Sequence, residues 1–439
     1  MTPEQPSAAS PPADTSVSAR TVALEVVSGA LRRGRAMDED PPDLMQLEAR
    51  DRAFARAIAA MTLRRLGQID DLIARCVERA IPHSDFVVQD ILRVAVAQLV
   101  FLGTAAHAAV STAVDLVGAR GRPRYAGLVN AVLRRLAREG AAMLGAQDEA
   151  RLNTPHHFWQ GWVAAYGEDT ARAIARAHLK EPPLDLSVKS DAEGWAAKLE
   201  AELLPTGALR RKPGGAISDL PGFAEGAWWV QDAAAALPAK LLGDVAGKTV
   251  VDLCAAPGGK TMQLASLGAL VVAVDISAKR LGRVKENLAR TGLAADLVEA
   301  DAATWRPLVP ASHILLDAPC TATGTIRRHP DIARLKTRAD IERLSATQDR
   351  LLANAAQMLG PGGVLVYAVC SLEPEEGLAR VSALLRRDGS LRRLTVTPQE
   401  IGGLTEAISP QGDLRTLPCH WADKGGMDGF YAARLVKRS

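Results

Sequence analysis

The chain contains 439 residues with a formal net charge of +3, and 48% of its residues are hydrophobic. This length predicts two or three domains, and this hydrophobic content is enough for real cores, which excludes a fully disordered chain. No secretory signal or long uncharged apolar segment is present, so we expect a cytosolic protein with reduced thiols and no membrane contact. The five cysteines are too widely spaced for a zinc ribbon or knuckle, and we predict no metal site.

The N-terminal part begins with a tail and continues as helices. Residues 1–19 are rich in Pro, Ser and Ala, a composition that predicts disorder. Over residues 20–140, apolar side chains recur at helical spacing, as at Leu92, Val96 and Val100, and Gly or Pro residues interrupt the pattern only briefly. Mutual packing of such faces predicts an all-α domain.

The basic residues of this helical region are all arginines. Between Arg20 and Glu139 there are eighteen arginines, fourteen acids and no lysine. A guanidinium group binds a phosphate through two parallel hydrogen bonds, so this composition is compatible with phosphate contacts. The solvated surface of ordinary helices explains the same composition, and both interpretations stay open.

The remainder of the chain changes character twice. Residues 141–226 predict a helical connector that ends at Pro182-Pro183, and then a small α+β element with a strand at 184–188. From 227 to 439, apolar strands alternate with helices, which predicts an α/β domain of Rossmann type with a doubly wound, mostly parallel sheet. The expected strands are 249–254, 270–275, 296–300, 313–317 and 364–369, with 430–436 antiparallel at one side, and the clearest helices are 278–291 and 341–359.

A Gly-rich turn follows the first of these strands. The turn Ala255-Ala-Pro-Gly-Gly259 lacks the spacing of a dinucleotide fingerprint or a phosphate-binding loop. Asp275 ends the second strand, where a carboxylate suits a ribose diol, and Asp301 ends the third, where it could accept from an exocyclic amine. A single such acid is as often an ordinary turn or cap residue. Two at consecutive strand ends favour a nucleoside ligand without a pyrophosphate.

Two cysteines end predicted strands in the same domain. Cys320 follows Asp-Ala-Pro after one strand, and Cys370 directly follows another. Free cysteines are most often buried and inert, but a position beside a cofactor turn suggests covalent chemistry on a bound substrate. The residues after Cys370 are expected to open a helix, whose dipole would stabilise a thiolate. Cys254 is expected to pack, and Cys76 and Cys419 are given no role.

These segments together resemble the RNA cytosine-C5 methyltransferases. The matching motifs are Asp252-Leu-Cys-Ala-Ala-Pro-Gly-Gly-Lys-Thr261, Asp317-Ala-Pro-Cys-Thr-Ala-Thr-Gly324 and Val369-Cys-Ser371, in the order and spacing of the family. Near the N-terminus, Leu92-Arg-Val-Ala-Val-Ala-Gln-Leu-Val-Phe-Leu102, His107-Ala-Ala-Val110 and Gly127-Leu-Val-Asn-Ala-Val-Leu-Arg-Arg135 resemble the NusB-like RNA-binding domain. Bacterial members that act on 16S ribosomal RNA carry this domain fused to the catalytic one. The resemblance covers roughly residues 20–437.

The resemblance assigns roles to matching positions. Asp275 would hold the ribose of S-adenosylmethionine, Asp301 would lie at its adenine end, and Asp317 would face its methionine portion and the target base. Cys370 would be the nucleophile that adds to carbon 6 of cytosine, and Cys320 would help to release the product. Asp428-Gly-Phe430 also fits the family. The residues that would wrap the cofactor are Cys254, Ala255, Ala256, Pro257, Gly258, Gly259 and Lys260.

The implied function is methyl transfer to carbon 5 of a cytosine in 16S ribosomal RNA by a monomeric enzyme. The alternatives are the same chemistry on transfer RNA or on another ribosomal cytosine, and a non-catalytic RNA-binding assembly protein. The presence of both cysteines argues against the last. Two positions depart from the family: Val369 stands where a threonine is usual, and Leu186-Ser-Val-Lys189 stands where an Arg-Val-Asn type of sequence is common, which puts one expected RNA or interdomain contact in doubt.

Overall fold

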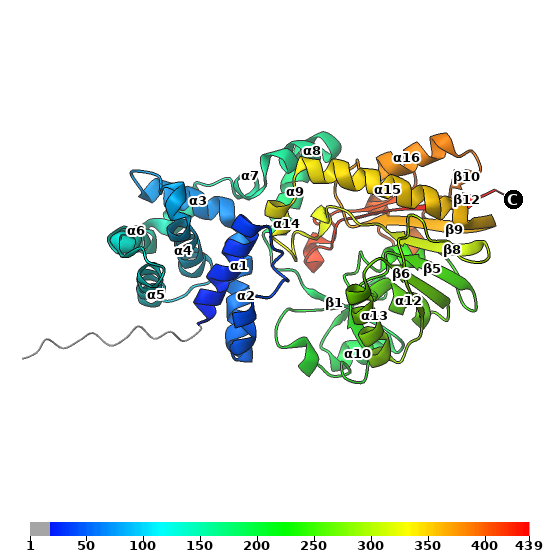
Figure 1. The fold of residues 1–439 in the computed structure, drawn as a ribbon, viewed down its shortest axis with the longest axis horizontal. Coiled ribbons are helices and arrows are strands. Elements are labelled where there is room, and N and C mark those ends of the chain that lie inside the picture. The colour runs from blue at the N-terminus through cyan, green and yellow to red at the C-terminus, as the bar shows by residue number, and fades with distance from the viewer. Residues whose placement is uncertain (1–17, 439) are drawn as a thin grey trace, which may run out of the picture. The chain divides into compact units, whose positions relative to one another are not determined.

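The computed structural model describes residues 18–438, and Figure 1 shows its fold. The chain divides into two compact units, Met1–Asn153 and Thr154–Ser439. Most of the predicted tail, residues 1–17, lies outside the described residues. Helical structure begins directly after it, because the hydroxyl of Ser18 accepts a hydrogen bond from the backbone N–H of Thr21 and so caps the first helix.

Residues 18–153 form a bundle of helices, as their apolar spacing predicts (Figure 1). Gly34 ends the first helix with a left-handed backbone (φ 64°). The helix at 126–145 runs through residue 140, where a domain boundary was expected, because Met143 and Leu144 still pack on the same core. The helices are α1 (Ala19–Arg33), α2 (Ala49–Arg64), α3 (Leu66–Cys76), α4 (Phe86–Val96), α5 (Ala106–Ala119), α6 (Ala126–Gly145) and α7 (Glu149–Asn153).

The second unit is built on a sheet in the order β10-β12-β9-β8-β5-β6-β7, with β11 paired to β12. The run from β9 to β7 is parallel and β12 is antiparallel to β9, as predicted, but β10 lies beyond β12, so β12 is not an edge strand. The strands are β5 (Thr249–Leu253), β6 (Leu270–Asp275), β7 (Asp296–Glu299), β8 (Ala311–Asp317), β9 (Leu359–Val369), β10 (Leu391–Arg393), β11 (Leu414–Thr416) and β12 (Phe430–Lys437).

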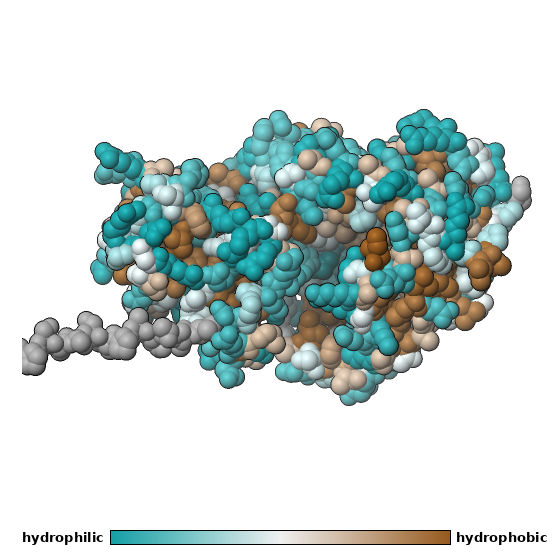
Figure 2. Space-filling view, viewed as in Figure 1, coloured by the Kyte–Doolittle hydropathy of each residue, from teal (hydrophilic) through white to brown (hydrophobic). Residues whose placement is uncertain are grey.

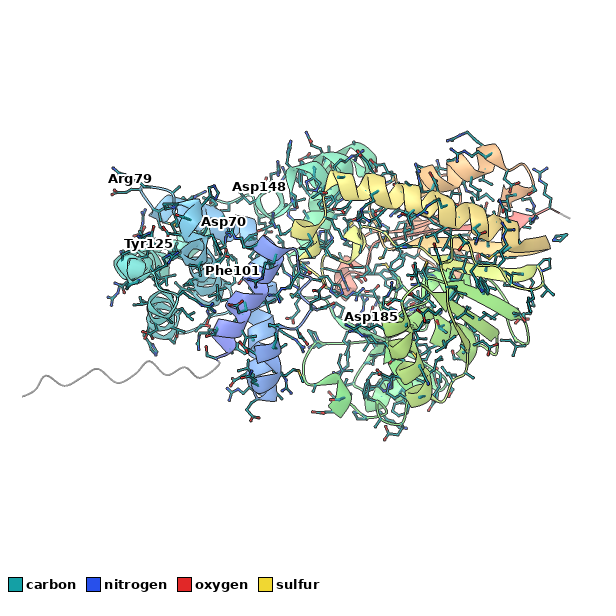
Figure 3. The ribbon with its side chains drawn as sticks, in the orientation of Figure 1. Asp70, Arg79, Phe101, Tyr125, Asp148 and Asp185 are labelled. Carbon is teal, nitrogen blue, oxygen red and sulfur yellow. The ribbon has the colours of Figure 1, made fainter. Side chains whose placement is uncertain are left out.

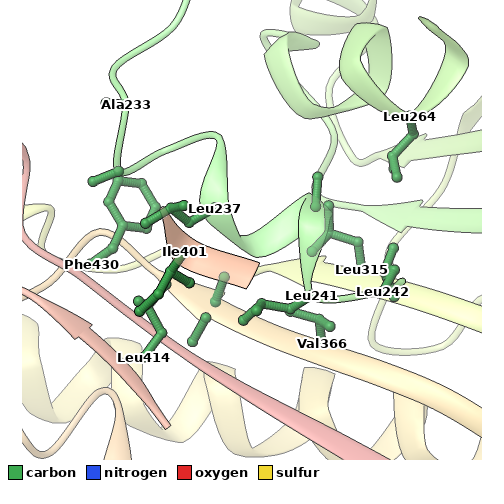
Figure 4. Close-up of a cluster of buried hydrophobic side chains, with 14 of the residues drawn as sticks. Ala233, Leu237, Leu241, Leu242, Leu264, Leu315, Val366, Ile401, Leu414 and Phe430 are labelled. Atoms are coloured by element: carbon green, nitrogen blue, oxygen red, sulfur yellow. The ribbon is translucent and has the colours of Figure 1, made fainter. Parts of the chain in front are cut away.

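Side chains that alternate along the strands form one core on each face of this sheet. Figure 4 shows the core on one face, where Leu264, Leu315 and Val366 pack together. The neighbouring strand residues Leu316 and Leu365 belong to the core on the other face, as the period of two in a strand requires. The helices of this domain are α11 (Leu237–Lys240), α12 (Gly259–Ser266), α13 (Ala278–Thr291), α14 (Ile332–Leu335), α15 (Arg338–Met358) and α16 (Leu378–Arg387).

A second, antiparallel sheet precedes this domain in the order β2-β3-β1-β4. Only its strand at 184–188 was expected, and the sheet extends to Val230, past the boundary placed at 226. Asp185, labelled in Figure 3, is fully buried and accepts two hydrogen bonds from Arg210, at 2.7 and 2.6 Å. The elements here are α8 (His156–Tyr166), α9 (Glu168–His178), α10 (Ala192–Lys198), β1 (Leu184–Val188), β2 (Glu202–Leu203), β3 (Leu209–Arg211) and β4 (Trp228–Val230).

Two local expectations were wrong. The strand expected at 364–369 begins earlier, because β9 starts at Leu359 and includes residues 360–363. The residues after Cys370 do not open a helix, since α16 begins only at Leu378, and seven residues of irregular chain and turn lie between them. A helix dipole therefore does not act on Cys370. Pro374 and Gly377 in this segment disfavour an immediate helix.

The surface in view in Figure 2 is mostly hydrophilic, and its hydrophobic side chains are scattered among polar ones. Within residues 18–438, no helix combines the length and the apolar character that crossing a membrane would require.

Candidate active site

A cavity of about 380 Å³ lies at the carboxyl ends of the parallel strands. This is the edge of an open α/β sheet at which ligands bind. Ala255, Gly258, Gly259 and Lys260 do not line the cavity, although they belong to the predicted cofactor segment. The predicted residues that do line it are Cys254, Ala256, Pro257, Asp275, Asp301, Asp317, Cys320 and Cys370.

The Gly-rich turn between β5 and α12 approaches its surroundings closely. Cys254 has a left-handed backbone (φ 62°), and Gly258 has φ 101°. A Cβ on Gly258 would lie 3.0 Å from the side chain of Val284, so only glycine fits there without movement. Burial raises the pKa of the Cys254 thiol to about 12, and the carboxylates of Asp317 and Asp275 act in the same direction. A thiol with so high a pKa keeps its proton, which does not suit a nucleophile, and Cys254 packs against the core on one face of the sheet.

Asp275 lies at the end of β6 and is 2% exposed. One carboxylate oxygen accepts the backbone N–H of Ala256 at 3.1 Å, and the other accepts that of Ser277 at 3.0 Å. Arg280 lies 3.3 Å from the first oxygen. Because a carboxylate oxygen has two lone pairs, Asp275 keeps acceptor capacity toward the cavity that it lines.

The far side of this part of the cavity combines a polar and an apolar group. Asp301 is exposed, and one of its oxygens accepts the N–H of Ala303 at 2.9 Å. Ile276, which follows Asp275, is 66% exposed beside it. An exposed apolar side chain in a cavity that two carboxylates also line suits a flat aromatic group that carries hydroxyl and amine donors. Ile276 and Arg280 were not predicted, although Ile276 directly follows Asp275 and Arg280 lies in the first turns of the helix after it.

Asp317, at the end of β8, is paired with Lys260 of α12, whose Nζ lies 2.7 Å from a carboxylate oxygen. Burial works against the charge of Lys260, but the attraction of Asp317 outweighs it and raises the pKa of the lysine. Beneath this pair, Asp252 accepts a hydrogen bond of 2.6 Å from Thr261, and burial raises the pKa of Asp252 to about 7. Lys260 thus acts on the site through Asp317 rather than by lining the cavity.

Cys320 and Cys370 meet at the ends of the neighbouring strands β8 and β9, with their Sγ atoms 3.5 Å apart. The hydrogen bond with Cys370, together with burial, raises the pKa of Cys320 well above its usual value. Cys320 therefore keeps its proton, and a protonated thiol can donate to the sulfur of Cys370. The hydrogen bond joins the two sulfurs, and either of them can be its donor.

A buried carboxylate that the sequence analysis did not single out braces both thiol segments. Glu376 accepts hydrogen bonds from the backbone N–H of Thr321 at 3.0 Å and from the hydroxyl of Ser371 at 2.6 Å. It also accepts the hydroxyl of Thr321 and the amide of Gln348. The sequence feature that could have indicated Glu376 is the acid-rich segment after Cys370. That segment was expected to open a helix.

The Asp428-Gly-Phe430 segment lies beside these elements, in a buried network of charges. Asp428 is fully buried, and Arg328 donates to its carboxylate at 2.8 Å. Arg327 also lies 3.3 Å from Asp428 and 3.5 Å from Asp232. Phe430 places its ring 5.1 Å from Nζ of Lys260. This motif therefore supports the cofactor turn and does not line the cavity.

Many arginines of the first unit are occupied by carboxylates of the same unit. Asp70, labelled in Figure 3, accepts from Arg93 at 2.7 Å, for example. Arg134 has no such carboxylate in the described chain and lines a groove of about 590 Å³ between α5 and α6, together with His107 and Arg138. The arginines paired with acids are Arg32, Arg33, Arg56, Arg65, Arg75, Arg93, Arg120, Arg122, Arg124, Arg135 and Arg138.

The chain resembles known families in both units. Residues 239–436 match the family described as 16S rRNA methyltransferase RsmB/F, and residues 17–138 match the NusB family. The protein named ribosomal RNA small subunit methyltransferase B from Pseudomonas putida is 38% identical over 415 residues, which cover 90% of this chain and 93% of that protein. The protein of the same name from Salmonella arizonae is 34% identical over 95% of this chain and 98% of its own length.

Solved structures resemble the fold as well. A crystal structure described as PH0851 covers 96% of this chain and 99% of its own, with a TM-score of 0.73 and 23% identity. A methyltransferase homologue from Pyrococcus horikoshii covers 65% of this chain and 96% of its own, with a TM-score of 0.54 and 27% identity.

Proposed function

The chain belongs to the RsmB/F family of 16S rRNA methyltransferases, and on that premise we propose that it methylates carbon 5 of a 16S rRNA cytosine through a covalent bond between Cys370 and carbon 6. The resemblance predicted from its motifs is confirmed at the level of the family. The enzyme is an S-adenosylmethionine-dependent methyltransferase.

The observation that carries the proposed mechanism is the approach of two thiols at the rim of the cofactor cavity. Carbon 5 of cytosine is a poor nucleophile, and addition of the Cys370 thiolate at carbon 6 makes it a reactive enamine carbon. Bound S-adenosylmethionine supplies an electrophilic methyl group. Loss of the proton from carbon 5 to a base then allows the bond between carbon 6 and Cys370 to break, and the thiolate leaves.

The proton on Cys320 supports the last of these steps. Because its pKa is raised, Cys320 remains a hydrogen-bond donor to the sulfur of Cys370 when that sulfur carries negative charge. A donor at that position stabilises the leaving thiolate. Asp317, held by Lys260, lies on the same side of the cavity and can accept hydrogen bonds from the exocyclic amine of the base.

The residues present at the other end of the cavity fit the cofactor. Asp275 and Asp301 supply acceptors for a ribose diol and an adenine amine, and Ile276 supplies an apolar surface between them. Gly258 allows the turn to pack closely on Val284 of α13, which holds the turn in place beside the cavity. The proposed holding residues are therefore the turn at 254–260 with Asp275, Asp301 and Asp317.

We assign RNA binding to residues 20–140 and methyl transfer to residues 227–439, with 141–226 between them. Arg134 is the candidate for a phosphate contact in the first unit, because it lines the groove between α5 and α6 and its side chain bonds there to Asn130 rather than to an acid. The target base must leave any stack to reach the cavity, which costs a few kcal/mol and least in a single-stranded loop.

Labelled S-adenosylmethionine and total RNA, incubated with the protein, test this proposal. Label in 16S rRNA as 5-methylcytosine supports it. Label in transfer RNA or in another ribosomal RNA would show that this RNA, and not 16S rRNA, is the substrate. No transfer at all would favour the non-catalytic assembly role. Mapping 5-methylcytosine in ribosomal RNA from cells with and without the protein then gives the target nucleotide.

A further inference from the structure

A second cavity in the same unit shares no residue with the candidate active site. It has a volume of about 420 Å³ and lies where the small antiparallel sheet meets α11 and the end of α12. Its polar side chains come from Ser187, Lys189, Thr206, Lys240, Gln263 and Ser266. No carboxylate lines it.

Both lysines of this cavity have only carbonyl partners in the described chain. Nζ of Lys189 donates to the carbonyl of Thr291 at 2.7 Å, and Nζ of Lys240 donates to the carbonyl of Thr206. Lys240 is only partly exposed, and burial lowers its pKa with no acid to oppose the effect. A partly buried cation without a counterion is costly, and a bound anion would remove that cost.

The cavity also holds an unused hydroxyl. Thr206 is 4% exposed, and its Oγ1 has no hydrogen-bond partner. An ammonium group has three donor hydrogens, of which the contacts above use one on each lysine. The hydroxyl of Ser266 donates to the carbonyl of Gln263, and that of Ser187 donates to Gln231. The free donors at this cavity are therefore the remaining N–H groups of the two lysines and the hydroxyl of Thr206, and their charge suits an anion with several oxygens.

We propose that this cavity binds a backbone phosphate of the RNA substrate between Lys189 and Lys240. The proposal rests on the proposed function, since it supplies a contact for the same RNA outside the reaction cavity. A phosphate fits because it offers at least two unesterified oxygens to the ammonium groups and to Thr206.

The test measures binding of a 16S rRNA transcript to the full-length protein over a range of salt concentrations. Lys189→Gln and Lys240→Gln are each expected to weaken binding at low salt by about tenfold. Each should also make the slope of log affinity against log salt shallower by about 0.7–0.9, the value for one phosphate contact. Lys285→Gln, which removes an exposed charge on α13, serves as the matched control and should change neither quantity.

Melting temperatures without RNA separate binding from folding. Lys240→Gln removes a cation without a counterion, so its melting temperature should not fall. Affinities and slopes of both variants equal to those of the wild type would overturn the proposal. A second result would also overturn it. If inorganic phosphate stabilised the wild type but not the variants, and RNA binding were unchanged in the variants, the cavity would bind a free anion and not the RNA. Failure of the proposed function is distinguishable from failure of this proposal, because the wild type would then transfer no labelled methyl groups to RNA.

Discussion

Ser371, the residue after the proposed nucleophile, donates a hydrogen bond of 2.6 Å to the buried carboxylate of Glu376. The same carboxylate accepts the backbone N–H of Thr321, the residue after Cys320. One side chain therefore positions the two segments that carry the thiols, although it does not line the reaction cavity.

Replacement of Glu376 should uncouple these segments. Glu376→Gln loses acceptor capacity for Thr321 and Ser371, and hydrogen bonds to charged groups contribute about 1.5–3 kcal/mol each. We expect kcat to fall by about tenfold or more while cofactor affinity, measured by calorimetry, is retained, since Glu376 does not contact the cofactor turn. Glu375→Gln is the control, because Glu375 only forms a surface ion pair with Arg338. Equal losses in both variants would contradict the positioning role.

The two thiols should fail in different ways. Without Cys370 no covalent bond to RNA can form, whereas without Cys320 the bond forms but breaks slowly. Cys320→Ala should therefore accumulate a protein–RNA adduct that survives denaturing electrophoresis, and Cys370→Ala should not. The double variant should behave like Cys370→Ala. An adduct in Cys370→Ala alone would reverse the two roles, and two inert thiols would give no adduct in any variant.

Asp275 should contribute to cofactor binding and not only to the turn that it supports. Asp275→Ala is expected to weaken S-adenosylmethionine binding by one to two orders of magnitude, about the 1.5–3 kcal/mol of a charge-assisted hydrogen bond. Calorimetry measures the affinity, and circular dichroism checks that the variant is folded. Asp296→Ala, at the opposite end of the neighbouring strand, should bind normally. Unchanged affinity in a folded Asp275→Ala protein would rule out the ribose contact.

Arg134 should contribute to RNA binding by the first unit. Arg134→Gln is expected to lower RNA affinity severalfold and to make its salt dependence shallower by about 0.7–0.9, as fewer counterions are released. Its neighbour on α6, Arg135, is already paired with Glu139. Arg135→Gln should therefore have the smaller effect, and the reverse order would show that the groove between α5 and α6 does not bind RNA.

Stability should fall as the pH rises through the range in which Glu373 ionises. Burial raises the pKa of Glu373 from 4.5 to about 7, against the hydrogen bond that it accepts from Trp162. A carboxyl group whose pKa is higher in the folded than in the unfolded state contributes its full stabilisation at pH values below the unfolded-state pKa. This contribution is lost as the pH rises through the folded-state pKa. The loss is roughly 3 kcal/mol between pH 4.5 and 7. The free energy of unfolding, measured with urea at several pH values, should decline less with pH in Glu373→Gln than in the wild type. If the two plots of this free energy against pH were parallel, a group other than Glu373 would cause the decline.

Motifs and periodicity predicted the parts of this protein that depend on local sequence. The strand at 270–275 and the helix at 278–291 were predicted to the residue, because an apolar run and a capped amphipathic helix are both visible in the chain. Strands β10 and β11 have three residues each, too short to show a period. The roles of Glu376 and Lys260 depend on contacts with residues 55 and 57 positions away, which no local pattern encodes.

The separation of 3.5 Å between the sulfurs of Cys320 and Cys370 is only about 1.5 Å longer than a disulfide bond. A peroxide can therefore oxidise the pair, with both thiol protons and two electrons passing to the oxidant to form water and a disulfide between Cys320 and Cys370. The proposed nucleophile would then be held in the disulfide until a reducing thiol released it. Ribosome modification by this enzyme would then follow the redox state of the cell, and a purified sample stored in air should regain its activity with dithiothreitol.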